Sequence, residues 1–297
     1  MTTAHATVAA RGPATWRSQP ALNIRFPEVD ASVQQDEEWF EVELDGRWER
    51  RRIHDYDQIF SIEGLYESLV YHALECRSPK RVRDLLIETT NDAGLDPSDL
   101  RVIDLGAGNG IMGERLRDVG VERITGVDIL PEAAMAAERD RPDVYEDYVV
   151  ADLCELSDEN RARLLASRPN VLSVVAALGF GDIPPRAFAE AFNLIETDGY
   201  VAFTLNEAFV RGSDRSGFAR LIRAMLHTGV GEIEGYRRYF HRRAISGERI
   251  FYVVFIARKQ RDIPADMLRT AEAGTSTGVS SSGDSPSSLL IERNGAS

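Results

Sequence analysis

The residue types best suited to chemistry lie in one stretch, Arg101 to Leu116, which reads RVIDLGAGNGIMGERL. Val102 and Ile103 favour a buried strand, glycines at 106, 108 and 110 interrupt it, and a helical pattern resumes at Ile111. A strand, a glycine turn and a helix bring main-chain N–H groups and a helix N-terminus against a ligand. Glycine suits such a turn because it accepts positive φ and lets a ligand approach bare backbone. The stretch therefore predicts a ligand-binding loop.

Two classes of ligand fit this loop. Gly108, Gly110 and Gly113 satisfy the dinucleotide pattern G-x-G-x-x-G, and Asp128 ends the next strand-like segment. Glycines 106, 108 and 110 also satisfy G-x-G-x-G, and Asp104 precedes them. A carboxylate at this position would repel the pyrophosphate of a dinucleotide and would attract a cation. Asp104 therefore favours a positively charged cofactor.

The stretch VIDLGAGNGIMGERL resembles motif I of class I S-adenosylmethionine-dependent methyltransferases, in which an apolar strand leads into D/E-x-G-x-G-x-G. S-adenosylmethionine carries a sulfonium and an ammonium but no phosphate. Later segments match the same family in register: GVDI, ADLCEL, NVLSVVAALGFGDIPP and DGYVAFTLNE, followed by a closing hairpin like the family's reversed seventh strand. More loosely, ALGFGDIPPRAFAEAF with YVAFTLNE resembles small-molecule-type methyltransferases, including the Williams–Beuren-region methyltransferase-like proteins.

The resemblance implies a set of cofactor-binding residues. It places Asp128 on the ribose hydroxyls, Asp152 near the adenine amino group, and Leu153 against the adenine ring. The full set that it implies is Asp104, Gly106, Gly108, Asn109, Gly110, Asp128, Ile129, Asp152, Leu153 and Ala176.

Catalytic residues are harder to assign from the sequence. Methyl transfer from a sulfonium needs alignment and exclusion of water, and a hydroxyl acceptor also gains from a base. Asp182, His241 and Tyr56 are the candidates, with His54 and Glu207 beside them, and each could equally be a turn cap, a surface residue or a packing contact. There is no N/D-P-P-[FY] signature after the fourth strand of the pattern, and Ile183-Pro184-Pro185 begins a helix there.

Metal chemistry is not expected. The five histidines lack metal-ligand spacing, and no His/Asp/Asp constellation can be assembled. The cofactor prediction is therefore S-adenosylmethionine with no metal.

The elements that would position these residues alternate along the chain. Strand patterns at 101–105, 123–129, 147–153, 170–178 and 199–206 are separated by helical patterns at 131–140, 159–168 and 185–195. A helix at 217–229 follows, and then two long strands joined by the turn Ser246-Gly247. Alternating strands and helices predict βαβ units with right-handed crossovers. The expected fold is α/β: a Rossmann-like, mostly parallel methyltransferase sheet with an antiparallel strand seven and helices on both faces.

A smaller unit is expected before this sheet. Residues 36–95 read as a hairpin turning at Asp45-Gly46, followed by two or three helices that form an N-terminal cap or a lid. The methyltransferase domain is expected at 96–261. Residues 1–35 and the Ser/Gly-rich tail 262–297 are expected to be disordered.

Composition narrows the class of partner. The chain has 297 residues, 43% of them hydrophobic, and a net charge of −13, which argues against a general nucleic-acid binder. Two distant cysteines suggest a reducing compartment, and no apolar run is long enough to span a membrane, so a cytoplasmic protein is expected. The expected partner is a small-molecule acceptor, and the sequence does not indicate an oligomeric state.

Three functions remain open from the sequence. The first is a class I methyltransferase acting on an N or O atom of a small molecule or of a protein side chain. The second is an NAD-dependent oxidoreductase that uses glycines 108, 110 and 113. The third is a non-catalytic protein of the same fold that binds a partner.

Overall fold

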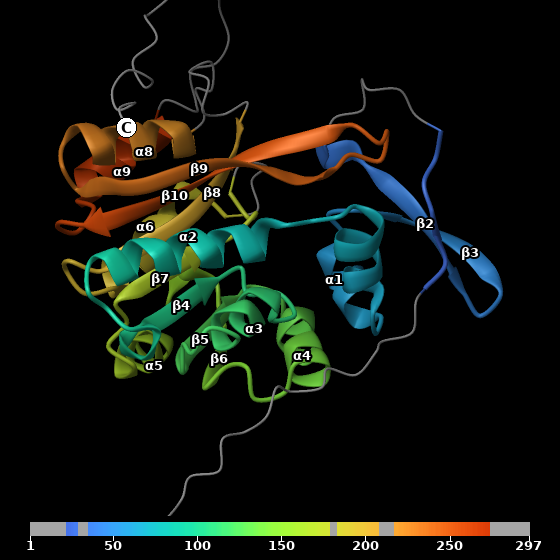
Figure 1. Ribbon diagram of the computed structural model, residues 1–297, viewed down its shortest axis with the longest axis horizontal. Coiled ribbons are helices and arrows are strands. Elements are labelled where there is room, and N and C mark those ends of the chain that lie inside the picture. The colour runs from blue at the N-terminus through green and yellow to red at the C-terminus, as the bar shows by residue number, and fades with distance from the viewer. Residues whose placement is uncertain (1–21, 29–34, 179–182, 208–216, 274–297) are drawn as a thin grey trace, which may run out of the picture.

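The computed structural model describes residues 22–28, 35–178, 183–207 and 217–273. Its main body is a seven-stranded sheet in the order β6-β5-β4-β7-β8-β10-β9 (Figure 1). The strands are β4 (Arg101–Leu105), β5 (Arg123–Asp128), β6 (Asp147–Val150), β7 (Val171–Val174), β8 (Tyr200–Asn206), β9 (Gly231–Arg243) and β10 (Arg249–Lys259). All pairings from β6 to β8 are parallel, and β10 is antiparallel to both of its neighbours. The expected α/β sheet with a reversed last strand is therefore confirmed.

Helices cover both faces of this sheet. The helices of the body are α2 (Ser78–Asp92), α3 (Ile111–Arg117), α4 (Pro131–Asp140), α5 (Asp158–Ala166), α6 (Pro185–Leu194), α8 (Gly217–His227) and α9 (Ala265–Ala273). Val82 of α2 and Leu116 of α3 belong to one buried cluster with β4, and Phe188 of α6 and Leu221 of α8 belong to the other. Two apolar layers thus enclose a sheet whose central strands are buried on both sides.

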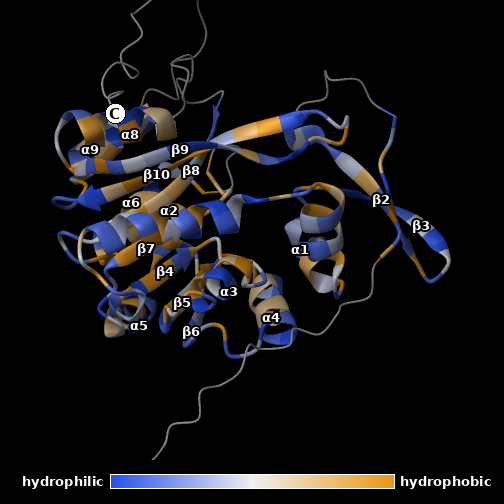
Figure 2. Cartoon of the chain, viewed as in Figure 1, coloured by the Kyte–Doolittle hydropathy of each residue, from blue (hydrophilic) through white to orange (hydrophobic). Residues whose placement is uncertain are grey.

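The apolar character of the strands follows from that double burial. Figure 2 shows hydrophobic colouring along β4 and β7, whereas β3 in the outer arm is hydrophilic. Every residue of β7 is buried, including Ser173. A polar side chain at such a position needs a hydrogen-bond partner inside the protein.

The sheet strands are shorter than expected at two places beside the site. The segment 147–153 ends its strand at Val150, and Leu153–Glu155 forms a 3₁₀ turn (η4) that Asp152 caps. The segment 170–178 forms a strand only over Val171–Val174, because the chain leaves extended geometry at Ala176, which has a φ of 56°. The residues that follow both strand ends line the cavity described below.

The N-terminal cap contains a three-stranded sheet and two short helices. Its elements are β1 (Ile24–Arg25), η1 (Gln35–Glu37), β2 (Trp39–Leu44), β3 (Arg47–Arg52), α1 (Tyr56–Ser61) and the π-helix η2 (Glu67–Ala73); a 3₁₀ turn, η3 (Pro97–Asp99), precedes β4. The expected hairpin and helices at 36–95 are present. α2 packs on the sheet through β8, β9 and β10. The predicted domain boundary at 95 and 96 stays a prediction.

The long β9–β10 hairpin joins the body to the cap. β8 pairs with β10 only over Tyr252–Arg258, so the turn end of the hairpin extends past the sheet towards α1 and β2 (Figure 1). There the N–H of Arg77 donates to the carbonyl of His241 (2.8 Å), and the N–H of Arg243 donates to that of Leu74 (2.7 Å). Ile245 packs into the cap core. The hairpin therefore carries residues of β9 to the cap.

Two expectations of disorder were wrong for part of their range. β1 lies within residues 1–35, and α9 lies within residues 262–297. α9 is stabilised by tertiary contacts, since Ala271 is buried in the core and Met267 and Leu268 pack against it. Local composition does not reveal these contacts, because they join the helix to α6 and α8, which are distant in the sequence.

Candidate functional site

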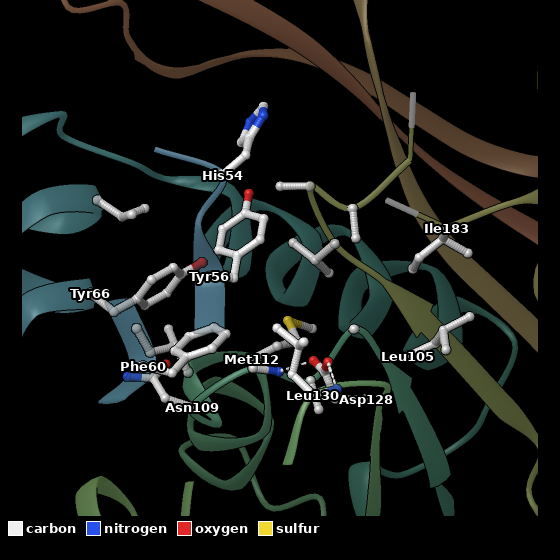
Figure 3. Close-up of a pocket in the computed structure, with 18 of the residues that line it drawn as sticks. His54, Tyr56, Phe60, Tyr66, Leu105, Asn109, Met112, Asp128, Leu130 and Ile183 are labelled. Carbon is white, nitrogen blue, oxygen red and sulfur yellow. Dashed lines mark hydrogen bonds between the residues drawn. The ribbon is translucent and has the colours of Figure 1, made fainter. Parts of the chain in front are cut away.

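A cavity of ≈ 380 Å³ lies at the carboxyl ends of the parallel strands, between the sheet and the cap. Figure 3 shows Tyr56, Phe60 and Tyr66 of the cap across from Leu105 and Ile183 of the body, with Asp128 and Leu130 beneath and His54 above. The strand order reverses between β4 and β7, and ligands of open α/β sheets bind beside such a switch point. The volume suits a small ligand.

Asp104 lies at the base of this cavity and spans the switch point. It is 1% exposed, and its carboxylate accepts hydrogen bonds from Ser173 Oγ of β7 (2.5 Å) and from Tyr145 Oη (2.8 Å). Burial raises the pKa of Asp104 from 3.8 to about 6, with the two hydrogen bonds opposing that change and Asp128 adding to it. The carboxylate therefore places a poorly solvated negative charge under the cavity.

Asp128 ends β5 and is tied to the glycine loop. Its Oδ2 accepts from the N–H of Gly108 (2.9 Å), and its Oδ1 accepts from the N–H of Leu130 (3.1 Å). Burial raises the pKa of this carboxyl also, against the effect of these N–H groups. Each oxygen keeps a further lone pair that a ligand hydroxyl could use.

The glycine loop has the backbone geometry that its composition predicts. Gly106, Gly108 and Gly110 all have positive φ. A Cβ on Gly108 would lie 3.0 Å from the Phe60 ring, so the cap packs directly on bare backbone there. Gly106, Gly108 and Asn109 line the cavity, whereas Gly110 caps the start of α3 and packs on Arg141 and Tyr145.

The residues after β5 and β6 form an apolar end of the cavity. Ile129 lines it and is 59% exposed, a high value for isoleucine, and the neighbouring Leu130 and Leu153 are less exposed. Asp152 is exposed, and its Oδ1 accepts from the N–H of Cys154 (2.8 Å). An open apolar surface beside two carboxylates suits the ring of a nucleoside.

Asn109 belongs to a buried polar network between the body and the cap. Its side-chain Nδ2 donates to Glu67 of η2 (2.5 Å), and its main-chain carbonyl accepts from Arg141 (3.1 Å). Arg141 also pairs with Glu67 (2.6 Å) and with Glu114 of α3 (3.1 Å). These contacts fix η2 against the glycine loop.

The structure separates the catalytic candidates. His241, Tyr56 and His54 line the cavity, as does Ala176, whose N–H donates to Thr204 Oγ1 (2.8 Å). Glu207 is not part of the lining and pairs with Arg238 (2.9 Å). Asp182 lies outside the described residues.

Sequence reasoning missed several residues that hold this site together. Ser173 and Tyr145 bind Asp104, and Ser78 binds His241 at Nδ1 (2.7 Å). A serine within the apolar run NVLSVV was a signal for Ser173. Ser78 reads only as a helix start before Pro79, and nothing local marks Tyr145.

Arginines of β9 pair with carboxylates within the protein. Arg237 pairs with Glu88 (3.0 Å), and Arg242 pairs with Glu38 (2.5 Å) in a buried contact. Within the described ranges, no group of His, Cys, Asp and Glu side chains has the arrangement of a metal site. None of the helices described is long and apolar enough to cross a membrane.

An α/β sheet with this order, a glycine loop after its first body strand and acids at the ends of the next strands define a nucleoside-cofactor-binding enzyme of Rossmann-like class. Residues 78–247, more than half of the chain, match the family described as "Methyltransferase domain". The chain belongs to this family and is an S-adenosylmethionine-dependent methyltransferase. That assignment selects a methyltransferase over the oxidoreductase and does not specify the acceptor.

Solved structures with similar folds include three methyltransferases. One is the Burkholderia thailandensis 1,6-didemethyltoxoflavin-N1-methyltransferase (17% identity, 80% of this chain and 99% of that one, TM-score 0.43). Another is the Synechocystis magnesium protoporphyrin IX methyltransferase (14%, 61% and 79%, 0.41). The third is a putative RNA methyltransferase from Pyrococcus horikoshii (18%, 60% and 83%, 0.43). At these values none identifies a substrate for this chain, and no curated protein matches it.

Proposed function

We propose that this enzyme transfers a methyl group from S-adenosylmethionine to an N or O atom of a small molecule held between the sheet and the cap. The proposal rests on one observation: the glycine loop and the aromatic side chains of the cap line the same cavity (Figure 3). A donor on the loop and an acceptor against the cap would then meet inside one enclosed space.

The residues present fit the cofactor. Asp128 would accept hydrogen bonds from the ribose hydroxyls, and Asp152 would accept one from the adenine amino group. Ile129 and Leu153 would pack on the adenine ring. The glycine loop would approach the donor with bare backbone, and Asp104 would lie beneath its cationic end. When bound, S-adenosylmethionine supplies an electrophilic methyl group on a positively charged sulfur.

The cap would orient the acceptor and exclude water. η2 is fixed to the glycine loop through Glu67, Asn109 and Arg141. Holding the two reactants in one geometry accelerates a displacement because the entropy cost of their encounter is met on binding. The protein therefore contributes alignment rather than a covalent step.

A small acceptor fits the charge of the molecule better than a nucleic acid does. The net charge is −13, and the arginines of β9 are paired with acids. A nucleic-acid binder needs unpaired basic groups to displace counterions from phosphates. Two free, half-buried cysteines are in keeping with a cytoplasmic enzyme.

Thermal unfolding with added ligands tests the cofactor. S-adenosylmethionine and S-adenosylhomocysteine should each raise the Tm, because a ligand that binds only the folded state stabilises it by mass action. NADH should leave the Tm unchanged, and a shift with NADH alone would contradict the proposal. Release of S-adenosylhomocysteine on incubation with a metabolite pool then tests small-molecule methylation; release only with RNA or protein added would overturn it.

A further inference from the structure

His241 occupies an enclosed position where the hairpin meets the cap. It lies on β9, is 4% exposed and lines the cavity. Its ring packs on Tyr252 of β10 with centroids 3.9 Å apart, and its Nδ1 lies 2.7 Å from Ser78 Oγ of α2. Among the described residues no hydrogen bond reaches Nε2. The second ring nitrogen is therefore left for a ligand.

A chain of hydroxyl groups continues from Nδ1 into the body. Ser78 Oγ lies 2.7 Å from Tyr239 Oη, and Thr204 of β8 hydrogen-bonds to the same tyrosine. Thr204 in turn accepts from the N–H of Ala176, in the loop after β7 (2.8 Å). These contacts connect the imidazole to the loop that the family resemblance places opposite the transferred methyl.

The surroundings keep the imidazole neutral. Burial, with a smaller contribution from Arg242, lowers the pKa of His241 well below 6.5. Arg242 itself pairs with the buried carboxylate of Glu38 (2.5 Å). A neutral histidine whose Nδ1–H donates to Ser78 presents a lone pair at Nε2.

The cap wall of the cavity is aromatic. Phe60 lies between Tyr56 (ring centroids 6.0 Å) and Tyr66 (5.0 Å), and Tyr66 contacts Tyr71 (6.0 Å). All four line the cavity, and Tyr56, Phe60 and Tyr66 are labelled in Figure 3. Rings at these separations offer edges and faces to a planar ligand.

We propose that the cap half of the cavity binds a hydroxylated aromatic small molecule and that His241 Nε2 accepts the proton of its hydroxyl group. This inference rests on the proposed function and narrows it to O-methylation. The acceptor oxygen forms the new C–O bond, the S–C bond breaks with its electron pair left on sulfur, and the hydroxyl proton moves to Nε2. Ser78 and Tyr239 are positioning residues that hold the ring with Nδ1–H directed away from the ligand.

Charge balance favours this arrangement despite the low basicity of a buried histidine. The sulfonium loses its positive charge in the step in which the imidazole gains one, so the net charge of the cavity does not change. The new imidazolium keeps Ser78 Oγ as acceptor at Nδ1. In a site of low dielectric constant, moving a positive charge from one group to another costs less free energy than adding a charge.

Binding of para-nitrophenol to the complex with sinefungin, an analogue that carries an ammonium group near the place of the sulfonium, tests the inference without turnover, because a positive charge stays beside the acceptor oxygen. Below the probe's own pKa, the wild-type protein should bind it saturably and raise its phenolate absorption. His241→Asn should bind the probe with similar affinity and give no phenolate band. His227→Asn, which changes an exposed histidine on α8, is the matched control and should behave as wild type.

The positioning residues are tested by the pH profile of the bound probe. Ser78→Ala and Tyr239→Phe should shift the ionisation midpoint of bound probe upwards, because the imidazolium loses its Nδ1 acceptor or the partner of that acceptor. Within the described part of the chain, five titratable or charged groups surround the ring: Cys76, Tyr239 and Arg242 of β9, Tyr252 of β10, and Tyr71 of η2, which lies near Cys76. The sulfur of Cys76 lies 3.9 Å from Nδ1 of His241. Tyr236→Phe, which changes an exposed tyrosine of β9 outside the cavity lining, should leave the midpoint unchanged.

When S-adenosylmethionine replaces the bound analogue, para-nitrophenol should be methylated and consumed. His241→Asn should lower kcat roughly 100-fold with KM little changed, the size expected for loss of a general base. Three outcomes would each overturn the inference. The first is that para-nitrophenol stays neutral when bound to the wild type, and the second is that it ionises equally in His241→Asn. The third is that it does not bind saturably although S-adenosylhomocysteine binds. Failure to bind S-adenosylhomocysteine would count against the proposed function as well. If His241→Asn does not fold, Ser78→Ala and Tyr239→Phe decide the question.

Discussion

Asp104 differs in one respect from what its position in the sequence suggests. Its charge is expected to attract a cationic cofactor directly, yet Asp104 is 1% exposed, and each of its oxygens already accepts a hydrogen bond, from Ser173 or from Tyr145. The carboxylate is fixed under the cavity, and its field rather than a free oxygen would act on the cofactor. Such a field is strong because the group is buried.

The raised pKa of Asp104 gives cofactor affinity a defined pH dependence. In the free protein this carboxyl titrates at about 6 instead of 3.8, so the folded state binds more protons than the unfolded state between these values. The contribution of Asp104 to stability is therefore full below about pH 4 and is lost as the pH rises through 6, a change of about 3 kcal/mol. S-adenosylmethionine should bind more tightly as the pH rises from 5 to 7 (roughly tenfold), since ionised Asp104 attracts its positive charge. Isothermal titration calorimetry at several pH values measures this.

The control for that experiment is Asp104→Asn. The amide keeps the shape of the side chain but does not titrate near pH 6, so the affinity of this variant should vary little over the same range. Its Tm relative to wild type should rise with pH, because only the wild type buries a charge. An unchanged pH dependence in the variant would assign the effect to another group, of which Asp128 is the nearest.

Asp128 should matter more directly for binding. Asp128→Asn replaces one oxygen with an amide nitrogen that cannot accept from the N–H of Gly108 or of Leu130. We expect the Kd for S-adenosylhomocysteine to rise roughly 10- to 100-fold, equivalent to about 1.4 to 2.8 kcal/mol. Calorimetry of Asp152→Asn provides the comparison, since asparagine preserves the helix cap and should cost less affinity. Equal losses in both variants would contradict the ribose assignment.

At the scale of elements, α3 explains why the chain also satisfies a dinucleotide pattern. Gly113 lies inside α3, where a Cβ would come within 2.6 Å of Val144 and 2.8 Å of Tyr145. The glycine is thus required for close packing of α3 on the segment before β6. The third glycine of dinucleotide-binding folds meets the same packing requirement. The G-x-G-x-x-G pattern of this chain therefore reflects the close packing that it has in common with those folds, and not a common ligand.

Gly113→Ala should therefore destabilise the protein. Overpacking at this contact is expected to lower the free energy of unfolding by about 1–3 kcal/mol, as measured by urea denaturation. Gly231→Ala is the matched control, because the nearest atoms to its Cβ would be 3.9 Å away and its stability should be unchanged. If Gly113→Ala were as stable as the control, α3 would have to be packed more loosely than the structure shows.

At the scale of the whole molecule, polar contacts join the cap to the body, and Arg141 is central to those beside the glycine loop. It is 9% exposed and pairs with Glu67 of the cap and Glu114 of the body, whose side chains are 14% and 6% exposed. Removing one partner of a buried ion pair leaves an uncompensated charge. This residue therefore couples the stability of the cap to that of the sheet.

Arg141→Met should lower the free energy of unfolding by about 3–5 kcal/mol, measured by urea denaturation. Arg163→Met is the control: its pair with Asp147 is about 40% exposed on both sides and should contribute less than about 1 kcal/mol. Since Glu67 would no longer be held at the glycine loop, Arg141→Met should also weaken cofactor binding. A variant as stable as the control would show that the cap does not depend on this network.

The sequence by itself determined the sheet, the glycine loop and the cofactor class, because these depend on local periodicity and on residues close together in the chain. Asp104 and glycines 106, 108 and 110 fall within seven residues. Their geometry is set by a strand, a turn and a helix that each form from local pattern.

Only the tertiary structure decided which distant residues meet at the acceptor end. His241 reaches Ser78 across 163 positions of sequence, and Ser173 reaches Asp104 across 69. It also showed that the last hairpin extends past β8 to the cap and that α9 packs on the core. Contacts of this kind follow from how separate elements pack, and no local signal in the chain records that packing.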